Sequence, residues 1–310
     1  MSESNPVLEK AAAPVSPTHR PTVPALEEMV GVAIPVLDHG FVRLVDYMGD
    51  DQAVVQAARV SYGSGTRRVR EDRGLIRYLL RHRHTTPFEM CEIKLHMKLP
   101  IFVARQIIRT RTASVNEYSG RYSILDREFY LPDPSVLAVQ SKSNRQGRGE
   151  PVSPERAAEI LAILKRDAET AYEHYEAMLG GRAETERTGE EAEGLARELA
   201  RIGLPVSFYT QWYWKIDLHN LLRFLSLRAD PHAQYETRVY AEAILGLLER
   251  WVPVVHEAFV DYQLRGAGLS RTEVEALSRM LRGERVDLAE LGLSAREEAD
   301  FRRTFGLPER

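Results

Sequence analysis

Residues 92–99 alternate between apolar and polar side chains, and this alternation limits the fold more than any other feature of the chain. The apolar positions are Ile93, Leu95, Met97 and Leu99. A period of two predicts a β-strand that buries one face and leaves the other face polar. Pro100 ends the strand and can open a helix, because the first position of a helix needs no N–H group. The chain must therefore build a sheet with one apolar side to cover.

Helical patterns fill most of the second half of the chain. A Ser-Pro pair at 153–154 is a start signal for an apolar stripe of helical period, which ends before the glycine pair at 180–181. Residues 206–215 are rich in aromatic and β-branched side chains and predict a strand, after which Asp217 can cap a helix. The Asp-Pro pair at 230–231 predicts the cap and first residue of a further long helix. Helices and strands segregated in this way predict the α+β class.

Composition along the chain predicts three parts. Residues 1–34 are rich in Pro, Ala, Ser and Val without helical or alternating periodicity, which is typical of a disordered arm. Residues 35–265 have a globular composition and no long linker, so they predict one compact body. Residues 266–310 are charged and predict a helical C-terminal extension of unknown role.

The cysteine count and the hydropathy narrow the class of protein. A single cysteine, Cys91, excludes a disulfide framework and any zinc site built on several thiolates. No apolar run approaches the ~20 residues that cross a bilayer, and the N-terminus lacks the apolar core of a signal peptide. We therefore expect a cytoplasmic protein with no membrane association.

Positive charge gathers in one part of a chain whose net charge is −3. Residues 59–127 hold 15 Lys or Arg but only 6 Asp or Glu. Such a band on an acidic protein indicates a local anion site rather than a general nucleic-acid surface. The ordinary alternative is that long charged side chains solvate helices, and Arg59, Arg67, Arg68 and Arg70 fit that explanation.

The segment 109–122 places three arginines around Ser, Asn, Glu and Gly. A guanidinium group offers a fork of donors that suits phosphate, and Glu117 can orient a hydroxyl or a guanidinium group. Together these residues predict an anion-binding constellation. A stretch rich in Ser, Asn and Gly is also typical of a plain turn.

At these residues the sequence resembles the flavin-dependent thymidylate synthases, the ThyX family. The family signature is Arg-His-Arg, seven residues and Ser, and here Arg109-Thr110-Arg111 is followed by seven residues and Ser119. Four further blocks match in order, at 57–61, 84–89, 101–106 and 227–234. The resemblance thus spans about residues 35–265.

The resemblance implies a methyltransferase that converts dUMP to dTMP. It implies 5,10-methylenetetrahydrofolate as carbon donor, NADPH as reductant and FAD as bound cofactor. The implied architecture is a central, mostly antiparallel sheet flanked by helices, with a flavin site unlike the Rossmann type. This agrees with the lack of a Gly-x-Gly-x-x-Gly motif after a strand. A homotetramer with active sites shared between subunits is also implied, with no nucleic-acid partner.

Site residues follow from the resemblance at matching positions. The implied dUMP ligands are Gln106, Arg109, Glu117, Ser119, Gly120, Arg121, Arg201 and Arg228. The implied FAD ligands are Ser61, His84, Thr86, Glu89, Arg109, Thr110, Arg111, Glu117, Asp217, His219, Arg223, Leu227 and His232. Arg228 is the implied catalytic residue, because a cation beside the pyrimidine favours its ionised form and raises electron density at the carbon to be methylated.

Five positions depart from the family pattern. Thr110 replaces the signature histidine, and Asp217, His219 and Arg223 stand where many members carry Asn, Arg and Asn. Met90 stands where His is common. We hypothesise that His219 and Arg223 exchange duties, which keeps a cation near the FAD phosphates. The departures bear on affinity and rate more than on the reaction.

Neither a protein nucleophile nor a metal is expected. Cys91 precedes the strand at 92–99 and is interpreted as a small core residue, and Ser119 has no histidine nearby in sequence to activate it. His82 and His84 form a metal-like pair without well-spaced further ligands, so a structural or flavin-side role is favoured. Two alternatives remain: a flavoprotein of this fold that has lost synthase activity, and a nucleic-acid-binding module that uses the basic band.

Overall fold

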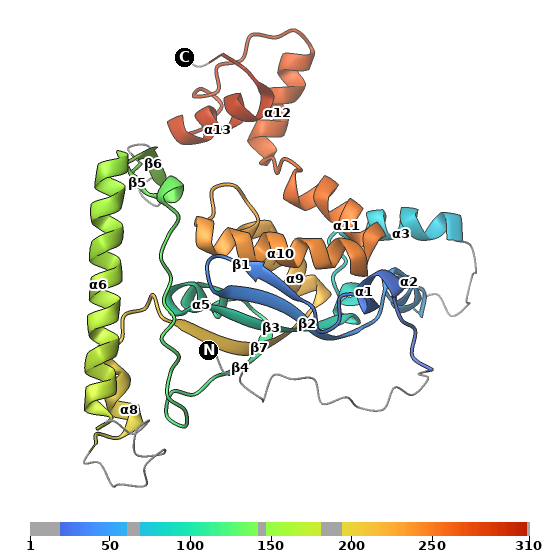
Figure 1. Ribbon diagram of the computed structural model, residues 1–310. Coiled ribbons are helices and arrows are strands. Elements are labelled where there is room, and N and C mark those ends of the chain that lie inside the picture. The colour runs from blue at the N-terminus through green and yellow to red at the C-terminus, as the bar shows by residue number, and fades with distance from the viewer. Residues whose placement is uncertain (1–18, 61–68, 142–146, 181–193, 309–310) are drawn as a thin grey trace. The chain divides into compact units, whose positions relative to one another are not determined.

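The computed structural model describes residues 19–60, 69–141, 147–180 and 194–308 (Figure 1). The chain divides into two compact units, Met1–Ala258 and Phe259–Arg310. The first unit holds a five-stranded sheet in the order β1-β2-β3-β7-β4, in which every neighbouring pair is antiparallel. Its strands are β1 (Ala33–Val36), β2 (Gly40–Met48), β3 (Glu92–Pro100), β7 (Tyr209–Asp217) and β4 (Ala113–Glu117). The predicted α+β class with an antiparallel sheet is confirmed.

The central strand β3 lies where the alternation predicts it. Ile93, Leu95, Met97 and Leu99 are buried on one face of the sheet, and the next strand, β7, adds the buried Trp212 and Trp214 to this face. Three helices cover it, as Figure 1 shows: α5 (Ile101–Ile107), α9 (Leu218–Arg228) and α10 (Tyr235–Trp251). Pro100 is the last residue of β3 and the N-cap of α5, so the helix begins one residue later than its earliest predicted start. The apolar side of the sheet is therefore covered by helices, as the alternation requires.

Short helices close one end of the sheet. These are α1 (Pro24–Glu27), α2 (Asp51–Arg59), α3 (Val69–Arg81), α4 (Thr86–Glu89) and α11 (Pro253–Phe259). Asp50 caps α2 by accepting a 2.8 Å hydrogen bond from the Ala53 N–H, while the Asp51 carboxylate accepts from the N–H groups of Val254 and Val255. The α4 turn packs against both α2 and α9.

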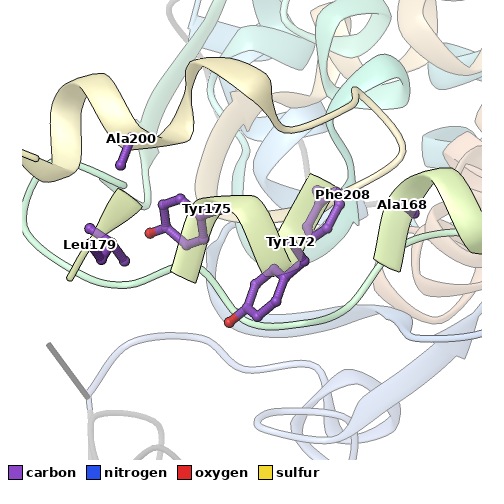
Figure 2. Close-up of a cluster of buried hydrophobic side chains, with 6 residues drawn as sticks. All are labelled: Ala168, Tyr172, Tyr175, Leu179, Ala200 and Phe208. Carbon is purple, nitrogen blue, oxygen red and sulfur yellow. The ribbon is translucent and has the colours of Figure 1, made fainter. Parts of the chain in front are cut away.

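A long helix, α6 (Pro154–Met178), stands beside the sheet and is anchored by aromatic side chains. It begins where the Ser-Pro signal predicts, with Ser153 accepting from the Arg156 N–H. Tyr172 and Tyr175 pack with Phe208, which comes just before β7, and the rings of Tyr172 and Phe208 stack at 5.8 Å (Figure 2). The neighbouring short elements are η3 (Pro134–Val136), β5 (Ala138–Gln140), β6 (Arg148–Pro151), α8 (Arg197–Ala200) and η4 (Arg201–Gly203).

Two expectations are wrong. Residues 1–18 of the predicted disordered arm lie outside the described residues, but the rest of the arm is ordered. Leu26 is fully buried in α1, and Arg20 donates a 2.7 Å hydrogen bond to the Tyr47 carbonyl. The helix predicted from residues 230–231 begins at Tyr235 instead, because the Asp230 carboxylate accepts from the backbone and ring nitrogens of His232 and closes a turn there.

The second unit has a small core of its own. Its helices are α12 (Arg271–Leu281) and α13 (Ala295–Phe305), and a π-helical turn, η5 (Val260–Leu264), precedes them. Each helix starts with a capping box, Ser270 with Glu273 and Ser294 with Glu297. Its core cluster consists of the buried side chains of Ala276, Leu288, Leu293 and Phe301. Across the described part of the chain, no helix has the length and apolarity that a membrane crossing demands.

Replacing Gly40 by Ala should lower the free energy of unfolding by about 1–3 kcal/mol. The added methyl group would press on the Tyr240 hydroxyl and lie 2.7 Å from the Val36 carbonyl oxygen. Gly246→Ala is the matched control, because this exposed position inside α10 has no atom within 4 Å of the added carbon. That variant should gain about 0.5–1 kcal/mol in urea unfolding. Equal losses in both variants would contradict the packing argument.

Candidate functional site

Four arginines surround one pocket of about 190 Å³ in the first unit. Arg109 and Arg111 come from the segment that leads into β4, and Arg223 and Arg228 come from α9. Within the described residues, none of these four guanidinium groups is in an ion pair. Uncompensated cations around a concave site focus a positive field, so the pocket is suited to an anion.

The α9 helix presents several of the predicted flavin residues along one side. His219, Arg223 and Leu227 are spaced four residues apart, which places them on the same face of a helix. Arg223 and Leu227 line the pocket, and Leu227 is 60% exposed. Asp217 caps α9 as predicted, accepting from the Asn220 N–H at 2.9 Å and from the Asn220 side-chain amide at 2.7 Å. The helix that carries the pocket cations is thus fixed at its start.

Other predicted flavin residues lie on elements beside α9. Thr86 and Glu89 are the first and last residues of α4, which packs against α9. His84 precedes α4, and its ring stacks on Tyr78 with centroids 5.8 Å apart. His232 lies in the turn after α9, where it pairs with Asp230 at 2.9 Å. Ser61, also predicted to bind the flavin, lies outside the described residues.

The expected single constellation at 109–122 is wrong, because a strand divides it. Residues 113–117 form β4, which pairs with β7 in the register Ala113 to Ile216 and Glu117 to Trp212. The first and last Cα atoms of this five-residue strand are four spacings apart, or about 13 Å at about 3.3 Å per residue. Arg109 and Arg111 therefore lie before one end of β4, while Arg121 follows the other end.

A second polar group gathers beyond the far end of β4. Gly120 is buried against Arg201 of η4, and a Cβ added to this glycine would lie 3.2 Å from the Arg201 Cδ. Arg121 pairs with Glu198 of α8 at 3.2 Å, and its N–H donates to the Ser119 hydroxyl at 3.3 Å. At the end of β4 itself, the Glu117 carboxylate accepts from the Thr210 hydroxyl at 2.8 Å. The implied dUMP ligands therefore fall into two groups rather than one.

Gln106 is held by α10. Its side-chain nitrogen donates to the Gln234 carbonyl, and its carbonyl accepts from the Thr237 hydroxyl at 3.3 Å. Since Gln106 comes three residues before Arg109, these bonds also fix the approach of the chain to the arginine pocket.

Two features of these sites were not predicted from the sequence. Phe224 lines the pocket and is 2% exposed, and its position next to Arg223 and three residues before Leu227 is the signal that could have identified it. Glu198 forms an ion pair with Arg121, and no pattern in the sequence predicted this pair.

Cys91 is a core residue, as expected. It is fully buried, and burial raises the pKa of its thiol to about 12, with Asp50 and Asp51 adding to the rise. The thiol is therefore protonated at neutral pH and is unsuited to nucleophilic attack. Within the ranges that the structure describes, His, Cys, Asp and Glu form no group of three or more that could hold a metal ion.

Comparisons with known proteins agree with this architecture. A family model described as thymidylate synthase complementing protein matches residues 43–254. Flavin-dependent thymidylate synthases from Ruegeria pomeroyi and Rickettsia conorii are each 57% identical, over 98% and 93% of this chain and 98% and 99% of their own length. The solved UMP/dUMP methylase PolB from Streptomyces cacaoi, bound with 5-Br dUMP, is 34% identical and superposes on 74% of this chain and 99% of its own with a TM-score of 0.63.

The fold and the family-model match define a protein of the thymidylate synthase complementing class. The chain belongs to the flavin-dependent thymidylate synthase family.

The residues of the pocket fit part of a flavin cofactor. Its guanidinium groups match the charge of a diphosphate, and Phe224 and the exposed Leu227 add apolar surface. A pocket of about 190 Å³ is nevertheless smaller than the roughly 300–1,000 Å³ of ordinary ligand sites. The described pocket of one chain therefore suits one portion of such a molecule.

Replacing Arg223 by Gln should weaken FAD binding by about 1.5–3 kcal/mol, the loss of a charge-assisted contact. His219→Gln should weaken it less, because His219 is on the same face of α9 but does not line the pocket. Titration of FAD into cofactor-free protein, followed by flavin fluorescence, measures both effects. Unchanged FAD affinity after replacement of both residues would remove the hypothesis that they keep a cation near the phosphates.

Proposed function

We propose that this chain catalyses the reductive methylation of dUMP to dTMP, with 5,10-methylenetetrahydrofolate as carbon donor and NADPH as reductant. Membership of the family supports the reaction class. One structural observation carries the site: four guanidinium groups, without an ion-pair partner among the described residues, gather between the segment before β4 and α9. Bound FAD would supply the hydride that completes the methyl group. The catalytic part of the chain would be residues 35–265, and the enzyme would act in the cytoplasm.

Arg228 is the proposed catalytic residue. It is half-buried at the C-terminal end of α9 and lines the pocket with the other three arginines. A guanidinium group beside the pyrimidine stabilises negative charge on the ring nitrogen, which makes the neighbouring carbon more electron-rich. Arg109 and Arg111 would hold anionic groups nearby. Activation by charge removes the need for covalent attack by the protein, which agrees with the buried, protonated Cys91.

The proposed active site is completed by a second copy of the chain. The two groups of implied dUMP ligands lie beyond opposite ends of β4, which are about 13 Å apart, and this is more than the reach of one phosphate or one base. Within one chain Arg121 is neutralised by Glu198, whereas the pocket arginines have no such carboxylate among the described residues. A homotetramer would bring Gly120, Arg121 and Arg201 of one subunit against the pocket of another.

Exposed apolar side chains beside the second group support association of subunits. Ile202 and Tyr122 are each 75% exposed, and Leu199 and Val206 are also exposed. Tyr122 lies beside α8, which carries Leu199 and precedes Ile202, because Arg197 of α8 donates a 2.6 Å hydrogen bond to the Tyr122 carbonyl. Large apolar side chains grouped on a surface mark an interaction site.

The test combines a spectrum with an isotope-release assay. The purified protein should show the absorption of an oxidised flavin, and with NADPH and the folate it should release tritium from dUMP labelled at carbon 5. The second candidate is a flavoprotein that has lost synthase activity, and the presence of Thr110 in the pocket favours it. Such a protein would be yellow and would oxidise NADPH without releasing tritium from dUMP. A colourless protein that binds oligonucleotides in a salt-dependent manner would refute both.

Cys91→Ala should retain tritium release within about twofold of the parent protein, because no thiolate takes part in the proposed reaction. The change removes one buried sulfur atom, so a modest fall in melting temperature is expected with it. Loss of tritium release from a variant that still binds FAD and stays folded would instead indicate cysteine catalysis.

Mixing two inactive variants should restore activity if the sites are shared. Arg121→Ala removes a residue of the second group and Arg228→Ala a residue of the pocket, so each homotetramer should have little dTMP synthesis. Mixed tetramers, refolded or co-expressed, should regain a fraction of the parent rate because some sites then combine two intact halves. Arg109→Ala mixed with Arg228→Ala is the control and should stay inactive, since both residues belong to the same pocket. Equal recovery in both mixtures would refute the sharing.

A further inference from the structure

A buried carboxylate lies just outside the predicted site. Glu236, the second residue of α10, is 3% exposed. Its two oxygens accept from the same Arg148 nitrogen at 2.5 and 2.7 Å, and one of them also accepts from the Tyr130 hydroxyl at 3.1 Å. Burial raises the pKa of Glu236, but the hydrogen bonds from Arg148 and Gln234 outweigh burial and hold it below its usual range. The side chain is therefore a carboxylate at neutral pH.

Hydrogen bonds lead from this carboxylate to Gln106. The Gln234 side-chain nitrogen donates to Glu236 at 3.0 Å, and the Gln234 carbonyl accepts from the Gln106 nitrogen. The Gln106 carbonyl then accepts from the hydroxyl of Thr237, which is fully buried. Three residues at the start of α10 thus determine how the Gln106 amide lies.

The carboxylate gives this chain of bonds a direction. A carboxylate can only accept, so Gln234 must turn its NH₂ group toward Glu236 and its carbonyl toward Gln106. Gln106 must then donate to Gln234 and turn its own carbonyl to Thr237. An amide has no such preference by itself, since its oxygen and nitrogen can exchange places by a flip. The second N–H of Gln106 has no partner among the described residues and is available to a ligand.

We propose that Glu236 is a positioning residue for the substrate: through Gln234 it fixes the Gln106 amide so that an N–H donor, and not a carbonyl, meets an acceptor oxygen of dUMP. This inference rests on the proposed function, which places Gln106 at the nucleotide. It adds that the group recognised by Gln106 is a hydrogen-bond acceptor. It also adds that the Glu236 carboxylate, two hydrogen bonds away from Gln106, determines this preference. Arg148, on β6, supplies the countercharge that keeps this carboxylate ionised inside the protein.

Gln234→Met is the principal test, because it keeps the side-chain volume and breaks the link without touching the ion pair. Gln234 is exposed, so the variant should fold. In the full-length holoprotein we expect Kd for dUMP, measured by calorimetry, to rise about tenfold. FAD content and melting temperature should stay near those of the parent protein. KM for dUMP should rise with kcat within about twofold.

Tyr130→Phe is the matched control. It also removes one hydrogen bond to the Glu236 carboxylate, but from a donor that does not lead to Gln106. We expect a lower melting temperature with an unchanged Kd for dUMP. Weakening of dUMP binding equal to that of Gln234→Met would mean that the carboxylate acts through general stability, and the inference would be overturned.

A double-variant comparison separates positioning from an independent contact. If Gln234 acts through Gln106, the combination of Gln106→Ala with Gln234→Met should bind dUMP no more weakly than Gln106→Ala alone. Additive losses, or an unchanged Kd in Gln234→Met, would overturn the inference. A parent protein that does not bind dUMP would overturn the proposed function itself. If the parent protein binds dUMP and the variants bind it equally well, only the role of Glu236 would be overturned.

Discussion

Mutual repulsion among four guanidinium groups is the constraint that the rest of this structure must satisfy. Arg109, Arg111, Arg223 and Arg228 line one small pocket, and none is in an ion pair with another described residue. Arg223 and Arg228 are attached to the helix α9, while Arg109 and Arg111 lie in the short turn segment between α5 and β4. α9 is capped by Asp217 at its start and places Arg228 in its last turn, where the helix dipole favours a cation. An anionic ligand relieves the repulsion, which makes the pocket a site that is stabilised by being filled.

Local patterns predicted the elements whose burial is dictated by their own sequence. The alternation around β3, the stripe of α6 and the Asp217 cap are of this kind, because each depends on neighbours within a few residues. β4 could not be predicted in this way. Ala113–Glu117 contains Ser and Asn, which favour turns, and it becomes a strand because β7 offers backbone partners about 100 residues away. The start of α10 was misplaced for the converse reason, because the side chain of Asp230 closes a local turn that competes with the helix.

The residues of the candidate site were proposed one by one from the resemblance, which did not predict their arrangement. The resemblance supplied the identities of its members, while the separation of Arg109 from Arg121 depends on β4. The arginine pocket forms because Ala113, at the start of β4, is in register with Ile216, one residue before the Asp217 cap of α9. The control of Gln106 by Glu236 lay beyond sequence reasoning altogether. It joins side chains that are about 130 positions apart, and its countercharge comes from a hairpin with no periodic signal.

The environment of the only cysteine has a pharmacological consequence. Cys91 is buried between α4 and β3, and Gly49 lies close to its sulfur. Its thiol donates a weak hydrogen bond of 3.6 Å to the Asp50 carbonyl. Oxidants and alkylating agents attack exposed thiolates, and this sulfur is neither exposed nor ionised. Covalent inhibitors that react with a cysteine thiol therefore have no accessible thiolate to react with in this chain. The arginine-lined pocket instead suits reversible inhibitors that carry negative charge.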